Sequence, residues 1–145
     1  MTEQETALKR LEALVGKWNT QWVSRLDPPV MVQGRATFSW LPGNFFLFYR
    51  SEVDNPDFPT GESIIGCDNA LETYTMLYSD SRGVTRLYAM SLSDGVWKLW
   101  RDDPSFAQRF TGTFSPNGRT ITGTWEKSFD GTNWEHDFDI TCTRM

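Results

Sequence analysis

The spacing of apolar residues changes once along this chain of 145 residues, at Gly16. Before Gly16, apolar residues recur every three or four positions, as on one face of a helix: Ala7, Leu8, Leu11, Leu14 and Val15. Thr2 and Glu5 have the spacing of a capping box, and Gly16 is a typical helix terminator. After Gly16, apolar and polar residues alternate, as they do in β-strands. We therefore expect one short amphipathic helix packed on a body made of strands.

Turn-forming residues divide the rest of the chain at regular intervals. They include Asn117-Gly118 and Asp130-Gly131, which favour tight hairpins. The intervening stretches predict ten strands, over residues 17–26, 30–40, 45–54, 62–67, 72–79, 84–92, 96–102, 106–114, 119–128 and 132–144. Nearly all connections are short enough for hairpins, so strands that follow one another are expected to pair antiparallel.

A sheet of ten antiparallel strands has two exposed edges unless it closes on itself. Closure as an up-and-down barrel removes both edges. The expected fold is therefore all-β, a ten-stranded antiparallel up-and-down barrel with one short N-terminal helix. A two-sheet sandwich is the alternative. The length suits a single domain over residues 1–145, with the helix in residues 1–16 and the barrel in residues 17–145.

The alternation also predicts which side chains face the barrel interior. On the last strand the expected inward set is Trp134, His136, Phe138, Ile140, Cys142 and Arg144. On the first strand it is Trp18, Thr20, Trp22 and Ser24. Hydroxyl groups are unusual in a solid apolar core. Because side chains do not fill barrels of more than about eight strands, we expect a cavity in the lumen.

Two stretches resemble a known superfamily. Gly16-Lys17-Trp18, together with Arg144 on the last strand, resembles the signature of the calycins, which include the lipocalins. The segment SIIGCDNALETYTMLYSDSRG resembles an uncharacterised bacterial lipocalin-like family, with Cys67 where Tyr is common. The resemblance extends more distantly to nitrobindins and fatty-acid-binding proteins. It implies that the first and last strands are neighbours and that Arg144 stacks across Trp18 to seal one end, which would make Gly16, Trp18 and Arg144 structural residues.

The inward-facing residues make the lumen the candidate site. The expected function is the binding of a small hydrophobic or aromatic molecule, which is the ligand class that the calycin resemblance implies. An inward Arg near a Tyr suits the carboxylate or enolate of such a ligand, as in fatty-acid-binding calycins. The sequence leaves open whether Arg86 faces the lumen or the solvent, and which face of residues 45–54 points inward. The candidate ligand-binding residues are Trp22, Phe38, Tyr74, Tyr78, Arg86, Tyr88, Gln108, Phe110, Trp134 and His136.

His136 is the only histidine, and three roles are open for it. It is a hydrogen-bonded polar group near the pocket rim, a donor or general base inside the pocket, or an axial ligand of haem iron. The second role would suit a cofactor-free cyclase or isomerase acting on an apolar substrate. The third is implied by the resemblance to nitrobindins and would make haem b the cofactor; otherwise we expect none. Trp22 departs from the nitrobindin pattern, which has a Gly-rich run there.

Charge and composition exclude several partners. The formal net charge is -5 and the Lys and Arg residues are not clustered, so we expect neither nucleic acid nor a membrane surface as a partner. The charged N-terminal residues do not match a signal peptide, and the expected location is the cytoplasm. Cys67 and Cys142 match no metal-binding spacing, so we expect buried thiols and no metal site.

Two further features concern the outside of the barrel. Trp97 and Trp100 have opposite parity, so one of them is expected outside, either under the helix or at a homodimer interface. The irregular segment from Asp54 to Glu62 carries Phe58 between two prolines. It is either a rim loop that gates the pocket mouth or a plain surface loop.

Overall fold

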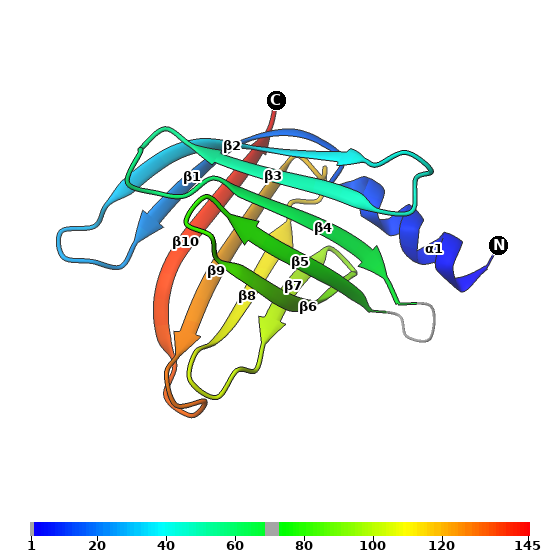
Figure 1. Ribbon diagram of the computed structural model, residues 1–145. Coiled ribbons are helices and arrows are strands. Elements are labelled where there is room, and N and C mark those ends of the chain that lie inside the picture. Colours follow the sequence, from blue (N-terminus) through cyan, green and yellow to red (C-terminus); the bar gives the residue numbers. More distant parts are fainter. Residues whose placement is uncertain (1, 69–72) are drawn as a thin grey trace.

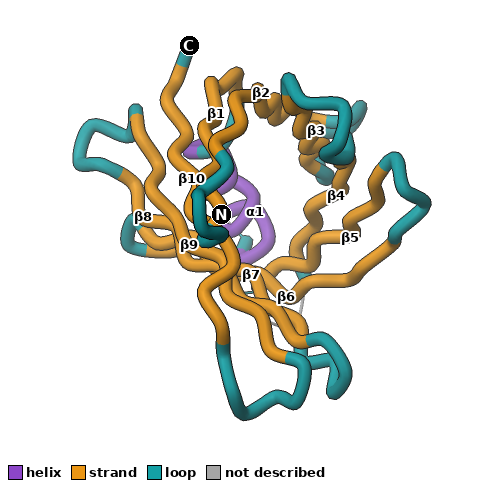
Figure 2. Tube along the Cα trace, turned by 90° about the vertical axis from the view of Figure 1, so that its left-hand side faces the viewer, coloured by secondary structure: helices purple, strands orange, loops and turns teal. Residues whose placement is uncertain are grey.

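The strands form a closed barrel (Figures 1 and 2). The computed structural model describes residues 2–68 and 73–145. The strands are β1 (Gly16–Ser24), β2 (Met31–Trp40), β3 (Leu47–Val53), β4 (Gly61–Cys67), β5 (Tyr74–Asp80), β6 (Thr85–Ser93), β7 (Val96–Arg101), β8 (Ala107–Phe114), β9 (Thr120–Ser128) and β10 (Glu135–Arg144). Consecutive strands pair antiparallel, and β1 pairs with β10 to close the barrel. The predicted fold is confirmed; residue 72, where the fifth strand was predicted to start, lies outside the described residues.

A short helix covers one end of the barrel. α1 (Glu3–Arg10) begins with the predicted capping box, in which the Glu5 N–H donates to the Thr2 hydroxyl and the Thr2 N–H donates to the Glu5 carboxylate, both at 3.0 Å. A 3-10 turn over Leu11–Ala13 follows. The apolar face of this segment packs into the barrel core, and Figure 2 shows α1 behind the barrel opening. Within the described part of the chain, no helix is long and apolar enough to cross a membrane.

Trp18 and Arg144 seal the end of the barrel that lies next to the helix. The Arg144 guanidinium lies 4.3 Å from the centroid of the buried Trp18 ring. It also donates hydrogen bonds of 2.6 Å to the carbonyl groups of Val15 and Ala13. Gly16 has a φ of +126°, and a Cβ atom there would lie 2.8 Å from Nη1 of Arg144. The stacking that the calycin resemblance implies is therefore present, and it ties the first and last strands to the segment after α1.

The last strand departs from regular alternation. Phe138 pairs with Trp125 and His136 pairs with Glu126, so the backbone of Asp137 has no paired residue on β9 and forms a β-bulge. The bulge reverses the faces of the residues before it. Phe138, Ile140 and Cys142 face the interior as expected, but the prediction that His136 shares their face is wrong.

The structure also resolves the parities that the sequence left open. On β3 the interior side chains include Leu47 and Tyr49, and on β6 Arg86 faces the lumen. Trp97 of β7 is buried inside the barrel, whereas Trp100 lies on the outer surface of the same strand.

Candidate functional site: an aromatic pocket in the barrel lumen

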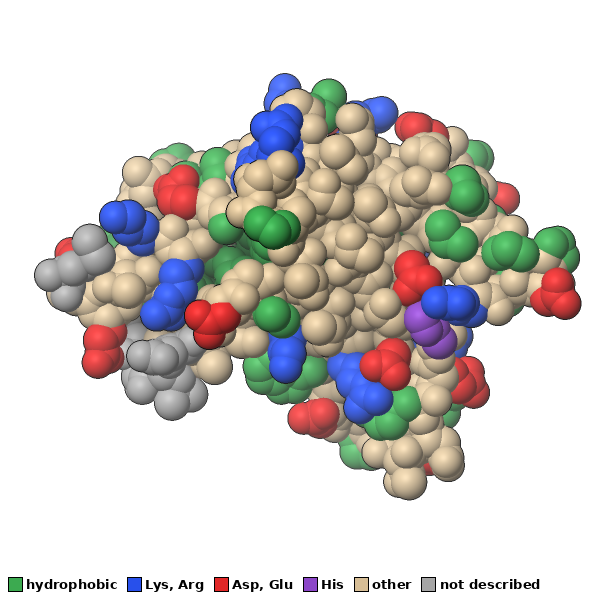
Figure 3. Space-filling model, turned by 180° about the vertical axis from the view of Figure 1, so that it is seen from behind, with side chains coloured by type: hydrophobic (Ala, Val, Ile, Leu, Met, Phe, Trp, Pro, Cys, Tyr) green, Lys and Arg blue, Asp and Glu red, His purple; other side chains and the backbone are tan. Residues whose placement is uncertain are grey.

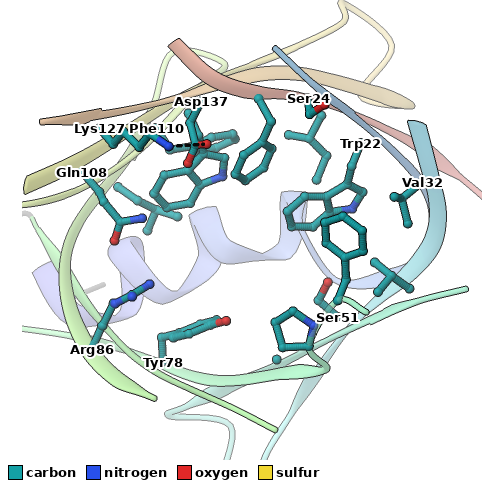
Figure 4. A pocket seen from close by; sticks show the side chains of 18 of the residues that line it. Trp22, Ser24, Val32, Ser51, Tyr78, Arg86, Gln108, Phe110, Lys127 and Asp137 are labelled. Atoms are coloured by element: carbon teal, nitrogen blue, oxygen red, sulfur yellow. Dashed lines mark ion pairs between the residues drawn. The ribbon is translucent and has the colours of Figure 1, made fainter. Parts of the chain in front are cut away.

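A cavity of about 670 Å³ occupies the lumen and opens at the end away from α1 (Figure 4). Leu26 and Val30, from the loop between β1 and β2, form part of its rim, and Phe58 lies on the rim from the loop between β3 and β4. Pockets for small molecules typically enclose about 300–1,000 Å³. The cavity therefore has the size of a small-molecule site.

Aromatic rings in contact with one another form much of the pocket wall. Trp22 stacks on Phe138 with 4.8 Å between ring centroids, and Phe138 lies 6.1 Å from Trp125. Trp125 continues the series to Phe110 at 5.2 Å, and Phe110 to Trp97 at 5.1 Å. Aromatic side chains offer a large apolar surface with little rotamer freedom, so this wall is suited to a flat or apolar ligand.

Two glycines allow the Phe110 ring to lie against the wall. A Cβ atom on Gly112 would lie 2.8 Å from this ring, and a Cβ on Gly123 would overlap it. Both glycines face inward on β8 and β9 and are paired with each other across the sheet. The missing side chains leave the space that the ring takes up, so the centre of the lumen stays open.

Arg86 and Gln108 project into the lumen from neighbouring parts of the wall (Figure 4). The Tyr88 hydroxyl donates a hydrogen bond of 2.7 Å to Oε1 of Gln108, which leaves the Gln108 NH₂ group as the amide donor. The Arg86 guanidinium lies 5.1 Å from the centroid of the Phe106 ring. Among the described residues, no carboxylate forms an ion pair with Arg86. Burial raises the pKa of Tyr88, so its hydroxyl stays protonated as the donor.

Tyr78 also lines the pocket, but its hydroxyl has a protein partner. It donates to Oδ2 of Asp80 at 2.7 Å, and Arg82 donates to the same oxygen at 2.7 Å. The hydrogen bond from Arg82 is the main reason why the pKa of Asp80 lies well below its usual range, and the Asp80 side chain is fully covered. Burial is the main cause of the raised pKa of Tyr78. At the mouth, Arg82 is therefore neutralised by Asp80, whereas Arg86 has no carboxylate partner among the described residues.

His136 lies at the pocket rim, and its ring nitrogen contacts a carboxylate on the outer surface. Nε2 is 2.8 Å from Oδ1 of Asp139. The same carboxylate accepts hydrogen bonds from Thr124 at 2.9 Å and from Arg25 at 2.8 Å. The bulge residue Asp137 instead faces the lumen and pairs with Lys127 at 3.4 Å. Figure 3 shows the one histidine at the surface, in purple, between acidic and basic side chains.

These positions do not fit haem ligation through His136. The nitrogen that would coordinate iron contacts the Asp139 carboxylate outside the barrel. On the inner side of the same strand, the Phe138 ring is stacked against Trp22. The arrangement of the described residues therefore lacks an imidazole that points into the lumen.

The ten candidate ligand-binding residues divide into three groups. Six of them line the cavity wall: Trp22, Tyr78, Arg86, Tyr88, Gln108 and Phe110. His136 lies at the rim, and the remaining three do not line the cavity. The indole ring of Trp134 lies under the guanidinium of Arg109, 3.9 Å from its centroid, on the outside of the barrel. Phe38 stacks on Tyr49 in the core below the cavity, with 4.2 Å between centroids, and the Tyr74 hydroxyl donates to the Ala7 carbonyl at 2.6 Å.

Several lining residues were not among the candidates, including Tyr49, Trp97, Trp125, Lys127 and Asp137. For Trp125 and Lys127 the sequence contains a usable signal, because both share parity with Ile121 on residues 119–128. For Asp137 it does not, because the bulge depends on how β10 pairs with β9.

Comparisons with known proteins support the barrel fold. No family model matches the sequence, and no curated protein matches it. The solved structure of Rv2717c from M. tuberculosis has a TM-score of 0.72 at 14% identity, with 96% of this chain and 97% of that chain covered. The S-type phycobiliprotein lyase CPES from Guillardia theta has a TM-score of 0.63 at 12% identity, covering 100% of this chain and 93% of that one.

A third similar structure is that of a larger protein. A member of the DUF3598 family from Nostoc punctiforme has a TM-score of 0.67 at 14% identity, with 93% of this chain covered. The chain spans 49% of that protein. At these identities the likeness concerns the fold alone, and this chain has the same kind of β-barrel as these proteins.

Proposed function

We propose that this protein binds a small hydrophobic or aromatic molecule that carries an anionic group, within the barrel lumen. The observation that carries this proposal is the Arg86 guanidinium, which faces an aromatic cavity without an ion-pair partner among the described residues. An uncompensated charge in apolar surroundings is costly, and a ligand anion would offset that cost. The aromatic wall would hold the rest of the ligand.

The polar group of the ligand would contact Arg86 and the amide NH₂ of Gln108. Both groups donate hydrogen bonds, and a carboxylate accepts them on its two oxygens. Tyr88 would act as a positioning residue because its hydrogen bond fixes the orientation of the Gln108 amide. The calycin resemblance of Gly16, Trp18 and Arg144 supports the same ligand class. One structural neighbour is named a phycobiliprotein lyase, and its similarity to this chain concerns the barrel fold alone.

Binding is favoured over catalysis by the state of the candidate acid and base groups. A cofactor-free cyclase or isomerase would need His136 or a tyrosine that is able to exchange a proton with the substrate. His136 contacts Asp139 outside the barrel, and the Tyr78 hydroxyl is bonded to Asp80. Burial raises the pKa values of Tyr78 and Tyr88, which disfavours either of them as a base.

Tryptophan fluorescence provides a direct test, because Trp22, Trp97 and Trp125 line the cavity. We would titrate the protein with 1-naphthoic acid and, separately, with its uncharged methyl ester. The acid is expected to quench the fluorescence and to bind more tightly than the ester. In the Arg86→Met variant the affinity for the acid should fall about tenfold or more, the usual worth of a charged hydrogen bond, while the affinity for the ester is unchanged.

A matched control is Arg109→Met, which removes a guanidinium from the outer face of the barrel. This variant should bind both probes as the wild-type protein does. If neither probe binds, lumen binding is rejected. If both bind equally in the Arg86→Met variant and in the wild-type protein, the apolar site stands and the anionic preference is rejected.

A further inference from the structure

One outer face of the barrel carries a row of apolar side chains across four strands. Phe48 of β3 pairs with Ile64 of β4, Ile64 pairs with Leu77 of β5, and Leu77 pairs with Leu87 of β6. All four side chains point away from the lumen. The exposed fractions are 41% for Ile64, 48% for Leu77 and 61% for Leu87.

A second row lies beside the first, on the side towards α1. Gly66, Thr75, Ala89 and Trp100 are paired in turn across β4 to β7. The Phe46 ring lies over Gly66, 3.1 Å from where a Cβ atom would be. We call these two rows together the apolar strip; its members are Phe46, Phe48, Ile64, Gly66, Thr75, Leu77, Leu87, Ala89 and Trp100. None of these side chains is charged.

The rest of the outer surface has a different composition. On β8, β9 and β10 the outward positions are mostly threonine or charged residues, such as Thr111, Thr122 and Thr141. Figure 3, drawn from behind, shows hydrophobic side chains in separate small groups among charged and other side chains. A solvent-facing side of an antiparallel sheet is normally polar, so the apolar strip indicates a surface that is covered by another molecule.

The area of the strip suits a protein interface. Phe46, Ile64, Leu77 and Leu87 are 51%, 41%, 48% and 61% exposed, and with about 200 Å² per large apolar side chain they expose on the order of 400 Å². An interface of standard size buries about 800 Å² on each partner, of which roughly 60% is apolar. The strip thus supplies most of the apolar surface that one side of such an interface needs.

We propose that the partner is a second copy of this chain, related by a twofold axis that passes through Leu77 and is perpendicular to the sheet. Such an axis places Leu77 against Leu77 of the second copy, and Leu87 against Ile64, so the centre of the strip is self-complementary. The axis also reverses the strand direction, and the two pocket mouths face opposite ways. Ligand binding in the two lumens is therefore independent of the interface.

The charges at the two ends of the strip fit the same axis. The Lys98 side chain points outward on β7, two residues from Trp100 in the direction of α1. The Glu52 side chain points outward on β3, two residues from Arg50 in the direction of the pocket mouth. The rotation brings Trp100 onto Arg50, and Lys98 onto Glu52. Arg50 binds both Glu52 and Glu62, and Arg35 binds Glu52 and Asp54. Three carboxylates therefore face two guanidinium groups at this corner, and Lys98 of the second copy would compensate the remaining negative charge. Trp100 over Arg50 would add a cation–π contact.

The test is the molar mass in solution, measured by light scattering during size-exclusion chromatography at several protein concentrations. The wild-type protein should have the mass of two chains. Leu77→Lys places two ammonium groups on the twofold axis and should give one chain, as should Leu87→Lys. Thr111→Lys, an equivalent change on the outer face of β8, should leave the dimer intact. Circular dichroism and binding of 1-naphthoic acid, compared with the wild-type protein, show whether the fold is retained.

Charge exchange tests the orientation. Lys98→Glu should lower the dimer affinity about tenfold, Glu52→Lys should do the same, and the double variant should recover most of the loss. A wild-type protein that is monomeric at all concentrations would overturn the proposal. So would a Leu77→Lys variant that remains dimeric, since the interface would then lie elsewhere. A double variant without recovery would overturn the twofold axis through Leu77.

Discussion

The Tyr88 hydroxyl lies 2.7 Å from Oε1 of Gln108, and this contact decides which end of the amide faces the lumen. A glutamine without it would present either its acceptor or its donor to a ligand. With the acceptor occupied, Gln108 adds a donor beside the Arg86 guanidinium, and the pocket wall becomes selective for acceptor groups.

The first prediction concerns Tyr88→Phe. Removing the hydroxyl frees the Gln108 amide to rotate, so the affinity for 1-naphthoic acid should fall severalfold, while the affinity for its methyl ester stays the same. The free energy of unfolding should fall by about 1 kcal/mol, the usual net worth of a buried hydrogen bond. Fluorescence titration and urea unfolding measure the two effects. An equal loss of affinity for both probes would contradict a positioning role.

The second prediction concerns Gly123→Ala. The added methyl group overlaps the Phe110 ring, which must turn into the lumen. Binding of either probe should weaken, and stability should fall by about 1–3 kcal/mol, as for other overpacked sites. Pairing the change with Phe110→Leu should restore part of the binding. Thr122→Ala, on the outer face of β9, is the control. Unchanged binding in Gly123→Ala would show that the ring position does not limit the cavity.

The third prediction concerns Arg144→Met. It removes the stacking on Trp18 and two charged hydrogen bonds of 2.6 Å to the carbonyls of Val15 and Ala13. The free energy of unfolding should fall by about 2–4 kcal/mol, while probe binding at the opposite end is retained in the folded fraction. Urea unfolding checks this, with Arg119→Met as a control on the same end. Equal stability of Arg144→Met and the control would contradict a sealing role.

The fourth prediction concerns acid pH. Hydrogen bonds from Arg82 hold the pKa of the Asp80 carboxyl well below its ordinary value of 3.8. A group whose pKa is lowered by folding stabilises the folded state above its unfolded pKa, and this contribution is lost as the pH falls towards the folded value. The stability advantage of the wild-type protein over Asp80→Asn should therefore be constant near neutral pH and shrink below about pH 4. Thermal melts across this range would measure it; a difference that grows in acid would contradict the assignment.

The barrel could be predicted from the sequence because its signals are local. The capping box of Thr2 and Glu5, the turn residues and the strand alternation each involve a few neighbouring positions. The pairing of the first strand with the last is long-range. It was predicted through the family resemblance of Gly16, Trp18 and Arg144. These features agree with one another, which is why one fold accommodates all of them.

The candidate site was predicted less completely because its signals are not local. Strand alternation placed Trp22 and Gln108 in the lumen correctly, but one extra residue at Asp137 was enough to turn His136 outward. Phe38 and Tyr74 do face inward, and only their depth excludes them from the cavity. Apolar and polar residues alternate poorly along the strand that carries Arg86. The direction of the Arg86 side chain therefore follows from its pairing with Tyr78 across the sheet. Depth, bulges and register depend on pairing across the sheet, which a single strand does not encode.

The pairing of Trp18 with Arg144 also constrains how the protein is made. All other pairings in the barrel join strands that are consecutive in the sequence, but β1 must wait for β10, which is synthesised after the other nine strands. Until then, the growing sheet has free hydrogen-bonding edges on β1 and on the newest strand, and such edges invite pairing with other chains. Closing so long a loop is slow compared with forming hairpins. The yield of folded protein in the cell should therefore depend strongly on how soon β10 can pair with β1.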